Sequence, residues 1–229
     1  MVTSKTAAHA HHRAQQQHEP NARTRRRLTA RPDLRASDPE PATARRALQI
    51  LRESDVGFVE HVTAVAYLAR LVAIHLGLRA SEVDRVELAA VLHDVGKLGI
   101  PDSLLCKPGL LDASESLLMR THAVLGERIV RAAPSLAHAA DMVRSSHERV
   151  DGGGYPDGLA GGDIPHGARI IAVCDAFDAM TSEHPYGVVL HPVAALAELR
   201  RGARTQFDTV IVEAFSELAA QPGAEFMRA

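Results

Sequence analysis

Tryptophan is absent from this sequence, and aromatic residues of all kinds make up only 3% of it. A core without large aromatic side chains has to be filled with Leu, Val, Ala and Ile, a composition that favours closely packed helices. Cysteine is also scarce, because Cys106 and Cys174 are the two in the chain and neither belongs to a Cys-X-X-Cys pair. This argues against a disulfide framework and against a thiolate zinc site.

Long apolar runs are missing as well. No stretch approaches the roughly 20 consecutive apolar residues of a membrane span. The first 45 residues also lack the apolar run, about 7 to 15 residues long, of a signal peptide. We therefore expect a cytoplasmic protein that has no contact with a membrane.

Basic residues are concentrated near the N-terminus, where residues 1–45 contain nine Lys or Arg against four Asp or Glu. Segments rich in Arg, Gln and Pro without an apolar pattern are typical of disordered chains. Binding of RNA, DNA or anionic lipid is the alternative for such a segment, and it is the less favoured of the two. We predict a disordered basic tail over residues 1–41.

From residue 42 onward, apolar residues recur at helical spacing, and clusters containing Gly, Pro or Asp separate the periodic segments. The pattern predicts an all-α domain over residues 42–220 and a flexible C-terminus over residues 221–229. The expected helices span residues 43–53, 56–76, 81–95, 102–105, 114–132, 136–147, 167–182, 192–201 and 208–220. Residues 148–166 differ, because they contain six Gly and two Pro. A long loop of this kind in a compact domain is often functional.

Several polar residues fall on the apolar faces of these predicted helices. His122 shares a stripe with Leu118, Leu125 and Ile129, and an inward position is likewise predicted for three further residues: His61, His147 and Asp175. A single inward His is more often a hydrogen-bonded core residue than a ligand. Burial of several imidazoles together with carboxylates is costly unless the carboxylates are compensated, and a shared cation provides the compensation.

The dipeptide His93-Asp94 ends an apolar predicted helix, and Gly96 interrupts that helix directly afterwards. Lys97 follows three residues after Asp94, which predicts a phosphate-holding cation on the same side as the metal-binding pair. Asp and His are ligands suited to iron, manganese or zinc, and a ligand set without Cys disfavours a structural zinc site. We therefore expect a metal site at His93 and Asp94, with Lys97 beside it as a phosphate-binding cation.

The order and spacing of these motifs resemble the HD-GYP domain over about residues 56–216. The segments that carry the resemblance are His93-Asp94-Val95-Gly96-Lys97, Lys107-Pro108-Gly109, His122, His147-Glu148, Gly152-Gly153-Gly154-Tyr155-Pro156, Ile164-Pro165, Ala168-Arg169-Ile170 and Asp175-Ala176-Phe177-Asp178-Ala179-Met180. The resemblance implies an all-helical HD-domain bundle with a long Gly/Pro-rich GYP loop. It also implies hydrolysis of cyclic di-GMP by a metal-bridging hydroxide.

Carried over position by position, the resemblance assigns two divalent metal ions, with iron or manganese expected. One metal is assigned to His61, His93, Asp94 and Asp175, and a second metal, bridged by Asp94, to His122 and His147. Asp94 and Lys97 are the expected catalytic residues. The expected substrate and loop residues are Gly153, Tyr155, Pro156 and His184. The GYP loop is also a possible docking surface for a partner such as a diguanylate cyclase.

The chain departs from the family pattern at three places. Ser146 precedes His147 where the family has a second His, and Gly57 replaces the Glu of members with three metals. Residues 184–188 read His-Pro-Tyr-Gly-Val, where the family has an Arg- and Lys-containing segment that grips the substrate. Periodicity slightly favours His147 over Ser146 as the inward residue.

These departures leave three functions open. The favoured one is a metal-dependent phosphodiesterase that acts on a cyclic dinucleotide, foremost cyclic di-GMP. A degenerate HD-GYP domain that binds a nucleotide or docks onto a protein, with weak or no activity, is the alternative. Oxygenase chemistry at a di-iron centre is a third, less favoured because Lys97 beside the site points to phosphate. The oligomeric state is left open.

Overall fold

The computed structural model describes residues 56–182 and 189–227, which belong to one unit, Asp38–Ala229. The predicted tail over residues 1–41, the predicted helix over residues 43–53 and His184 lie outside the described residues. The helices are α2 (Val56–His75), α3 (Ala80–Leu92), α4 (Asp102–Leu105), α5 (Ala113–Arg120), α6 (His122–Arg131), α7 (Ala140–Arg144), α8 (His166–Thr181), α9 (Pro192–Gly202) and α10 (Thr209–Ala219). Short 3₁₀ helices are η2 (Val95–Gly99), η3 (Ala137–Ala139), η4 (Gly161–Asp163) and η5 (Glu225–Met227).

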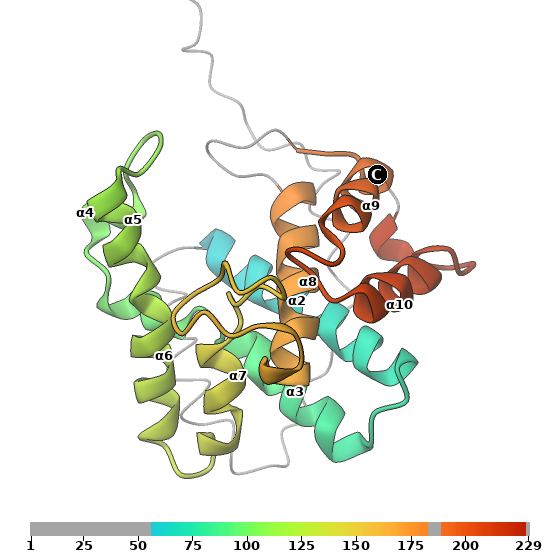
Figure 1. Ribbon diagram of the computed structural model, residues 1–229, viewed down its shortest axis with the longest axis horizontal. Coiled ribbons are helices and arrows are strands. Elements are labelled where there is room, and N and C mark those ends of the chain that lie inside the picture. Colours follow the sequence, from blue (N-terminus) through green and yellow to red (C-terminus); the bar gives the residue numbers. More distant parts are fainter. Residues whose placement is uncertain (1–55, 183–188, 228–229) are drawn as a thin grey trace, which may run out of the picture. The chain divides into compact units, whose positions relative to one another are not determined.

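The described residues contain no β-strand beyond two isolated bridges, Asp151 to Ala160 and Ala203 to Phe207. The all-α prediction is confirmed. Helices α2, α3 and α8 pack against one another, and α9 and α10 pack on α8 (Figure 1). Their buried side chains are mainly Val, Ala, Leu and Ile, as expected from the scarcity of aromatic residues.

Three of the five phenylalanines form a cluster that includes the C-terminal segment of the domain. The Phe177 and Phe215 rings lie 4.8 Å apart between centroids, and Phe226 contacts both rings at 6.1 and 5.7 Å. Phe226 lies within residues 221–229, the segment predicted to be a flexible C-terminus. In the structure this segment forms η5 and contributes a side chain to the aromatic cluster.

The expectation that no segment reaches the length of a membrane span was wrong for α2. Residues Phe58–His75 are long and apolar enough, by length and composition alone, to cross a membrane. The apolar character has a structural use here, because α2 packs against α3, α8 and α10. Val62, Val65, Ala69 and Val72 are buried in the core formed at these contacts.

Three predicted helices end or break earlier than expected. Helix α3 ends at Leu92, so His93 and Asp94 lie in a turn before η2. The predicted helix over residues 114–132 is interrupted at Thr121, whose hydroxyl donates to the Leu118 carbonyl at 2.6 Å. Helix α7 ends at Arg144, and the segment predicted to continue as helix to residue 147 forms a turn. All three interruptions occur beside polar residues of the candidate site.

A buried carboxylate fixes the Gly- and Pro-rich loop after α7 through hydrogen bonds to the loop backbone. Glu148 accepts hydrogen bonds from the backbone N–H groups of Asp157, Gly158 and Leu159 at 2.7, 3.1 and 3.2 Å. The bridge between Asp151 and Ala160 closes the base of the loop. A Cβ added to Gly154 would lie 2.4 Å from the Arg149 backbone nitrogen, so only glycine allows the chain to turn back this closely. The loop is therefore an ordered part of the fold.

Candidate metal centre

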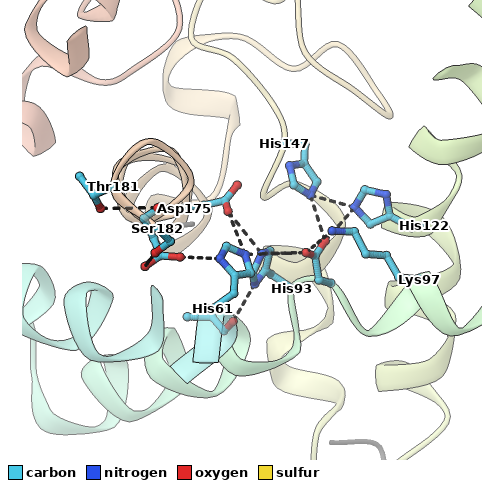
Figure 2. A network of polar contacts seen from close by, with 11 residues as sticks. His61, His93, Lys97, His122, His147, Asp175, Thr181 and Ser182 are labelled. Carbon is cyan, nitrogen blue, oxygen red and sulfur yellow. Dashed lines mark hydrogen bonds and ion pairs between the residues drawn. The ribbon is translucent and has the colours of Figure 1, made fainter. Parts of the chain in front are cut away.

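Six predicted ligands come from five different elements and meet in one place (Figure 2). His61 comes from α2, and Asp175 comes from α8. His93 and Asp94 lie in the turn after α3, His122 begins α6, and His147 lies in the turn after α7. His93, Asp94 and His122 are buried. The structure thus brings together every residue that the sequence predicted as a metal ligand.

Asp94 stands between two groups of imidazoles. Its Oδ2 atom lies 3.5 Å from His93 Nε2 and 3.9 Å from His61 Nε2. Its Oδ1 atom lies 3.3 Å from His122 Nε2 and 3.8 Å from His147 Nε2. Each group, taken with Asp94, offers ligand atoms within 4.8 Å of one another. One carboxylate is therefore shared by two clusters, each of which could hold a cation.

Asp175 completes the first cluster from the side of α8. Its Oδ1 atom lies 3.3 Å from His61 Nε2 and 3.7 Å from His93 Nε2. Its position on α8 follows from the turn of the helix, because Ile171, four residues earlier, is fully buried. Ala179, four residues after Asp175, is exposed. The inward direction predicted for Asp175 is correct even though its apolar stripe does not continue.

Hydrogen bonds at the Nδ1 atoms fix the orientation of three imidazoles. His93 donates to the Ala90 carbonyl at 2.8 Å, and His122 donates to the Met119 carbonyl at 2.7 Å. His61 Nδ1 pairs with the Asp178 carboxylate at 2.7 Å. In each case the Nε2 atom is the one left to face the carboxylates. Metal-ligating histidines in proteins are typically held in this way.

Asp178 was not singled out as a site residue from the sequence. A signal was available, since Asp178 lies three residues after Asp175 and seven after the buried Ile171, on the same side of a helix. Its carboxylate also accepts the Ser182 hydroxyl at 3.0 Å. Asp178 is therefore a positioning residue for His61.

The electrostatics of the metal-free cluster depend on close opposite charges. Burial lowers the pKa of His61, but hydrogen bonds to Asp175 and Asp178 outweigh it and raise that pKa to about 10. Burial raises the pKa of Asp94, yet the charges of Lys97 and His93 hold it well below its usual range. The clusters therefore contain ionised carboxylates at neutral pH.

His122 behaves differently, because burial lowers its pKa to about 4. Its imidazole is consequently neutral at pH 7 and has a free lone pair. The Nε2 atoms of His122 and His147 face each other at 2.8 Å, a separation at which the two atoms can share one proton or one cation. Two imidazole nitrogens that face each other in this way could both bind one metal ion.

Two buried polar atoms test whether a cation fits these clusters. His93 Nε2 and Asp94 Oδ1 are both buried and have no hydrogen-bond partner among the described residues. An unpaired buried polar atom costs about 1 to 3 kcal/mol, so such atoms are rare without a compensating ligand. One orphaned atom belongs to each cluster, and both are atoms that bind divalent cations. The residues present therefore fit a metal centre.

Lys97 lies at the edge of this centre. Its Nζ atom donates to Asp94 Oδ2 at 2.5 Å. Burial lowers the pKa of Lys97, but the Asp94 carboxylate outweighs burial and raises it. The ammonium therefore stays charged at neutral pH and is placed to act as a cation, not as a base.

The GYP loop covers the second cluster. The Tyr155 ring stacks on the His147 ring with centroids 5.1 Å apart and an interplanar angle of 14°. The Tyr155–Pro156 peptide is cis, and the Gly153 N–H donates to Asp151 at 2.9 Å. Of the three predicted loop residues, Tyr155 therefore contacts the second cluster, and Gly153 and Pro156 are its near neighbours in the loop.

A cavity of about 350 Å³ opens between the GYP loop and α8, and His147, Tyr155 and Asp175 contribute to its wall. Arg120 also lines the cavity, and it was not predicted as a site residue from the sequence. The cavity adjoins both the loop and the first cluster, so a molecule bound at the metals has room to extend into it.

Known proteins share the sequence features of this chain. The sequence profile of the HD domain family matches residues 43–211. The cyclic di-GMP phosphodiesterase response regulator RpfG of Xanthomonas campestris is 40% identical over 184 residues, which cover 80% of this chain and 49% of the relative. The 3'3'-cGAMP-specific phosphodiesterase 2 of Vibrio cholerae is 42% identical over 128 residues, which cover 55% of this chain and 24% of the relative.

The fold is shared as well. A solved structure of an HDGYP protein from Bdellovibrio bacteriovorus matches with a TM-score of 0.61 at 17% identity, covering 80% of this chain and 62% of that one. The chain spans about half the length of the curated relatives it matches most extensively. The sequence profile, the relatives and the all-helical fold agree with one another. This chain belongs to the HD domain family.

Proposed function

We propose that this chain is a metal-dependent phosphodiesterase that hydrolyses a cyclic dinucleotide, with cyclic di-GMP as the substrate. The observation that carries the proposal is the division of the Asp94 carboxylate between two histidine clusters. Relatives that bear the names cyclic di-GMP phosphodiesterase and 3'3'-cGAMP-specific phosphodiesterase support the substrate class.

Two divalent ions are the proposed cofactors, and iron or manganese suits a donor set of imidazoles and carboxylates without thiolates. His61, His93, Asp94 and Asp175 would hold one ion, and Asp94, His122 and His147 the other. Such ions supply Lewis acidity toward the phosphate and a water that is nucleophilic at neutral pH.

Residues of the chain itself would stabilise the charge on the phosphate and orient the metal ligands. Lys97 stays protonated and offers a positive charge beside Asp94, where a phosphate gaining negative charge would be stabilised. Asp178 holds the His61 ring, and the Ala90 and Met119 carbonyls hold His93 and His122. Because these partners fix the ring orientations beforehand, little reorganisation is needed when the substrate binds.

The alternative function is a degenerate domain that binds a nucleotide, or docks onto a protein such as a diguanylate cyclase through the GYP loop, with weak or no activity. Ser146 favours it, because this residue stands where the family pattern has a histidine. Its hydroxyl donates to the Val143 carbonyl at 3.0 Å and so serves the end of α7. A cytoplasmic location and a disordered tail over residues 1–41 are further proposals that rest on sequence alone.

The test combines metal analysis with hydrolysis assays on cyclic di-GMP, 3'3'-cGAMP and cyclic di-AMP. We expect the wild-type chain, purified without a chelating tag, to contain metal and to cleave cyclic di-GMP. Asp94→Asn should lose metal from both clusters and lower the rate at least about 10³-fold, because one carboxylate serves both. Asp163→Asn removes an exposed carboxylate remote from the centre and is the matched control. Binding of cyclic di-GMP without cleavage by metal-loaded wild type would instead favour the regulatory alternative.

A further inference from the structure

The cavity beside the metal centre has the size of a small-molecule site. Its volume of about 350 Å³ falls in the usual range of roughly 300 to 1,000 Å³ for ligand pockets. Arg120 and Arg149 are the arginines in its wall, and Asp175 and Glu148 are the acids. Which ligand the cavity can bind depends on which of these charged side chains already have a partner in the protein.

Most of these charges already have partners. Arg149 forms two hydrogen bonds to Asp151, at 3.0 and 2.6 Å. Glu148 is buried and accepts three backbone N–H groups of the loop. Asp175 faces His61 and His93. These groups are committed to the loop and to the metal centre, so they leave little charge for a ligand.

Arg120 is the exception. It makes no ion pair and no side-chain hydrogen bond within residues 56–182 and 189–227. Its guanidinium carbon lies 5.1 Å from the centroid of the Tyr155 ring. That ring in turn stacks on His147, at 5.1 Å between centroids. The guanidinium is therefore held near the metal centre by an aromatic contact that leaves its hydrogen-bond donors unused.

The position of Arg120 in the chain also places it next to the metal centre. Arg120 is the last residue of α5, and His122 begins α6 after the interruption at Thr121. The helix break thus puts a metal ligand and a cation two residues apart, one in the buried cluster and one in the cavity wall. An uninterrupted helix would turn two such residues to nearly opposite sides.

We propose that Arg120 binds the phosphate of the cyclic dinucleotide that is not being cleaved, an inference that rests on the proposed function. A cyclic dinucleotide carries two phosphates, and when one lies on the metal centre the other extends away from it. The planar guanidinium offers paired N–H donors that match two phosphate oxygens. Arg120 is the cation of the cavity wall, among the described residues, whose donors are available for this contact.

The test measures binding separately from turnover. The Kd of a slowly cleaved phosphorothioate analogue of cyclic di-GMP is determined by calorimetry on manganese-loaded protein, and KM and kcat of cyclic di-GMP are determined on the same protein. Arg120→Gln should raise Kd and KM about 10- to 100-fold. The change in kcat should stay within about threefold, because the contact is made equally in ground and transition states. Metal content and melting temperature should match wild type.

Two further variants separate this role from a general effect of charge. Arg128→Gln removes an exposed arginine from the next helix and should leave Kd unchanged. Arg120→Lys keeps the charge but loses the planar fork, so its Kd should lie between those of wild type and Arg120→Gln. The fold-change should be the same for 3'3'-cGAMP, which shares both phosphates with cyclic di-GMP and differs in one base.

Three results would overturn the proposal. Equal Kd values for wild type and Arg120→Gln would remove Arg120 from the binding site while leaving the proposed function intact. A loss confined to cyclic di-GMP would assign Arg120 to a guanine base. If the wild-type chain neither binds nor hydrolyses any cyclic dinucleotide, the proposed function fails, and this inference fails with it.

Discussion

The Lys97 ammonium lies 2.5 Å from the same Asp94 oxygen that faces His61 and His93. A divalent cation held by those groups would compete with Lys97 for this oxygen. Lys97 would then be released toward a phosphate bound at the metals. This position places the Lys97 ammonium where it can serve the substrate.

We predict that Lys97→Met retains its metal but loses activity. Since Lys97 is assigned to phosphate and not to metal, turnover should fall about 10²- to 10³-fold, the usual effect of removing one transition-state contact. Metal analysis and kcat measured side by side provide the check. Lys107→Met, which removes a lysine paired with Glu115 away from the centre, is the control. Loss of metal from Lys97→Met would show that Lys97 supports the ligands themselves.

Ser146 gives a second prediction at this scale. His147 Nε2 faces both His122 and Asp94, whereas the Ser146 hydroxyl is spent on the Val143 carbonyl. A histidine at position 146 is therefore not needed to complete the second cluster. We expect manganese titration, under anaerobic conditions, to give two ions per chain for both wild type and Ser146→His. One ion in wild type rising to two in the variant, with a gain in activity, would favour the degenerate domain.

At the level of helices, the sequence predicted the inward position of His122 correctly, but from a stripe of residues that is not buried. The stripe drawn through Leu118, His122 and Ile129 assumed one continuous helix. In the structure Leu118 and Ile129 are 46% and 39% exposed, while His122 is buried. The actual buried face of α6 consists of His122, Ala123, Gly126 and Val130. Periodicity could not reveal this, because small residues carry little hydrophobic signal.

Periodicity also failed to predict where α3 and α7 end. Both helices stop shortly before a predicted ligand, at Leu92 and Arg144, instead of at the predicted residues 95 and 147. Side chains at a metal centre have to converge from several directions, and a turn allows this where a helix does not. Tertiary contacts therefore overrode local propensity at the places where function is expected.

The small residues of α6 serve a close contact with η2. A Cβ added to Gly96 would lie 1.9 Å from the His122 carbonyl oxygen and 2.5 Å from the Gly126 backbone nitrogen. Backbone atoms cannot move aside as a flexible side chain can, so the two segments would separate. This would carry Asp94 away from His122.

We therefore predict that Gly96→Ala lowers the free energy of unfolding by about 3 kcal/mol or more and also weakens metal binding. Chemical denaturation and metal analysis measure the two effects. Gly162→Ala is the control, because a Cβ there would meet nothing within 4 Å. Wild-type stability in Gly96→Ala would mean that η2 and α6 pack less closely than the structure indicates.

For the domain as a whole, the metal centre is the point where distant parts of the chain are joined. Its predicted ligands lie between residues 61 and 175 of the chain, and two of them, His61 and Asp175, come from the central helices α2 and α8. Cations bound here would link these elements to one another and add to the stability of the folded state in proportion to their affinity. Removal of metal should therefore lower the melting temperature of the domain.

The stabilisation of the fold by bound metal should depend on pH. Titration of His61 determines whether it rises or falls with pH. Its ring lies 3.3 Å from Asp175, 2.7 Å from Asp178 and 3.9 Å from Asp94, and the His93 ring is 5.4 Å away. In the metal-free protein these groups raise the pKa of His61 to about 10, above the value of about 6.5 in an unfolded chain. Protonated His61 thus stabilises the metal-free fold fully below about pH 6.5, and this contribution declines as the pH rises through 10.

A cation at Nε2 requires the neutral imidazole, so metal and proton compete for His61. We predict that the rise in melting temperature on adding Mn²⁺ to chelator-treated protein increases between about pH 6.5 and 8.5, since metal affinity grows as each proton becomes easier to displace. Scanning calorimetry at constant ionic strength measures the difference. His75→Gln, which removes a histidine paired with Glu217 away from the centre, should show the same pH dependence as wild type. A metal-induced shift that is constant or falls over this range would show that His61 does not bind metal, because its proton would then have no effect on the ion.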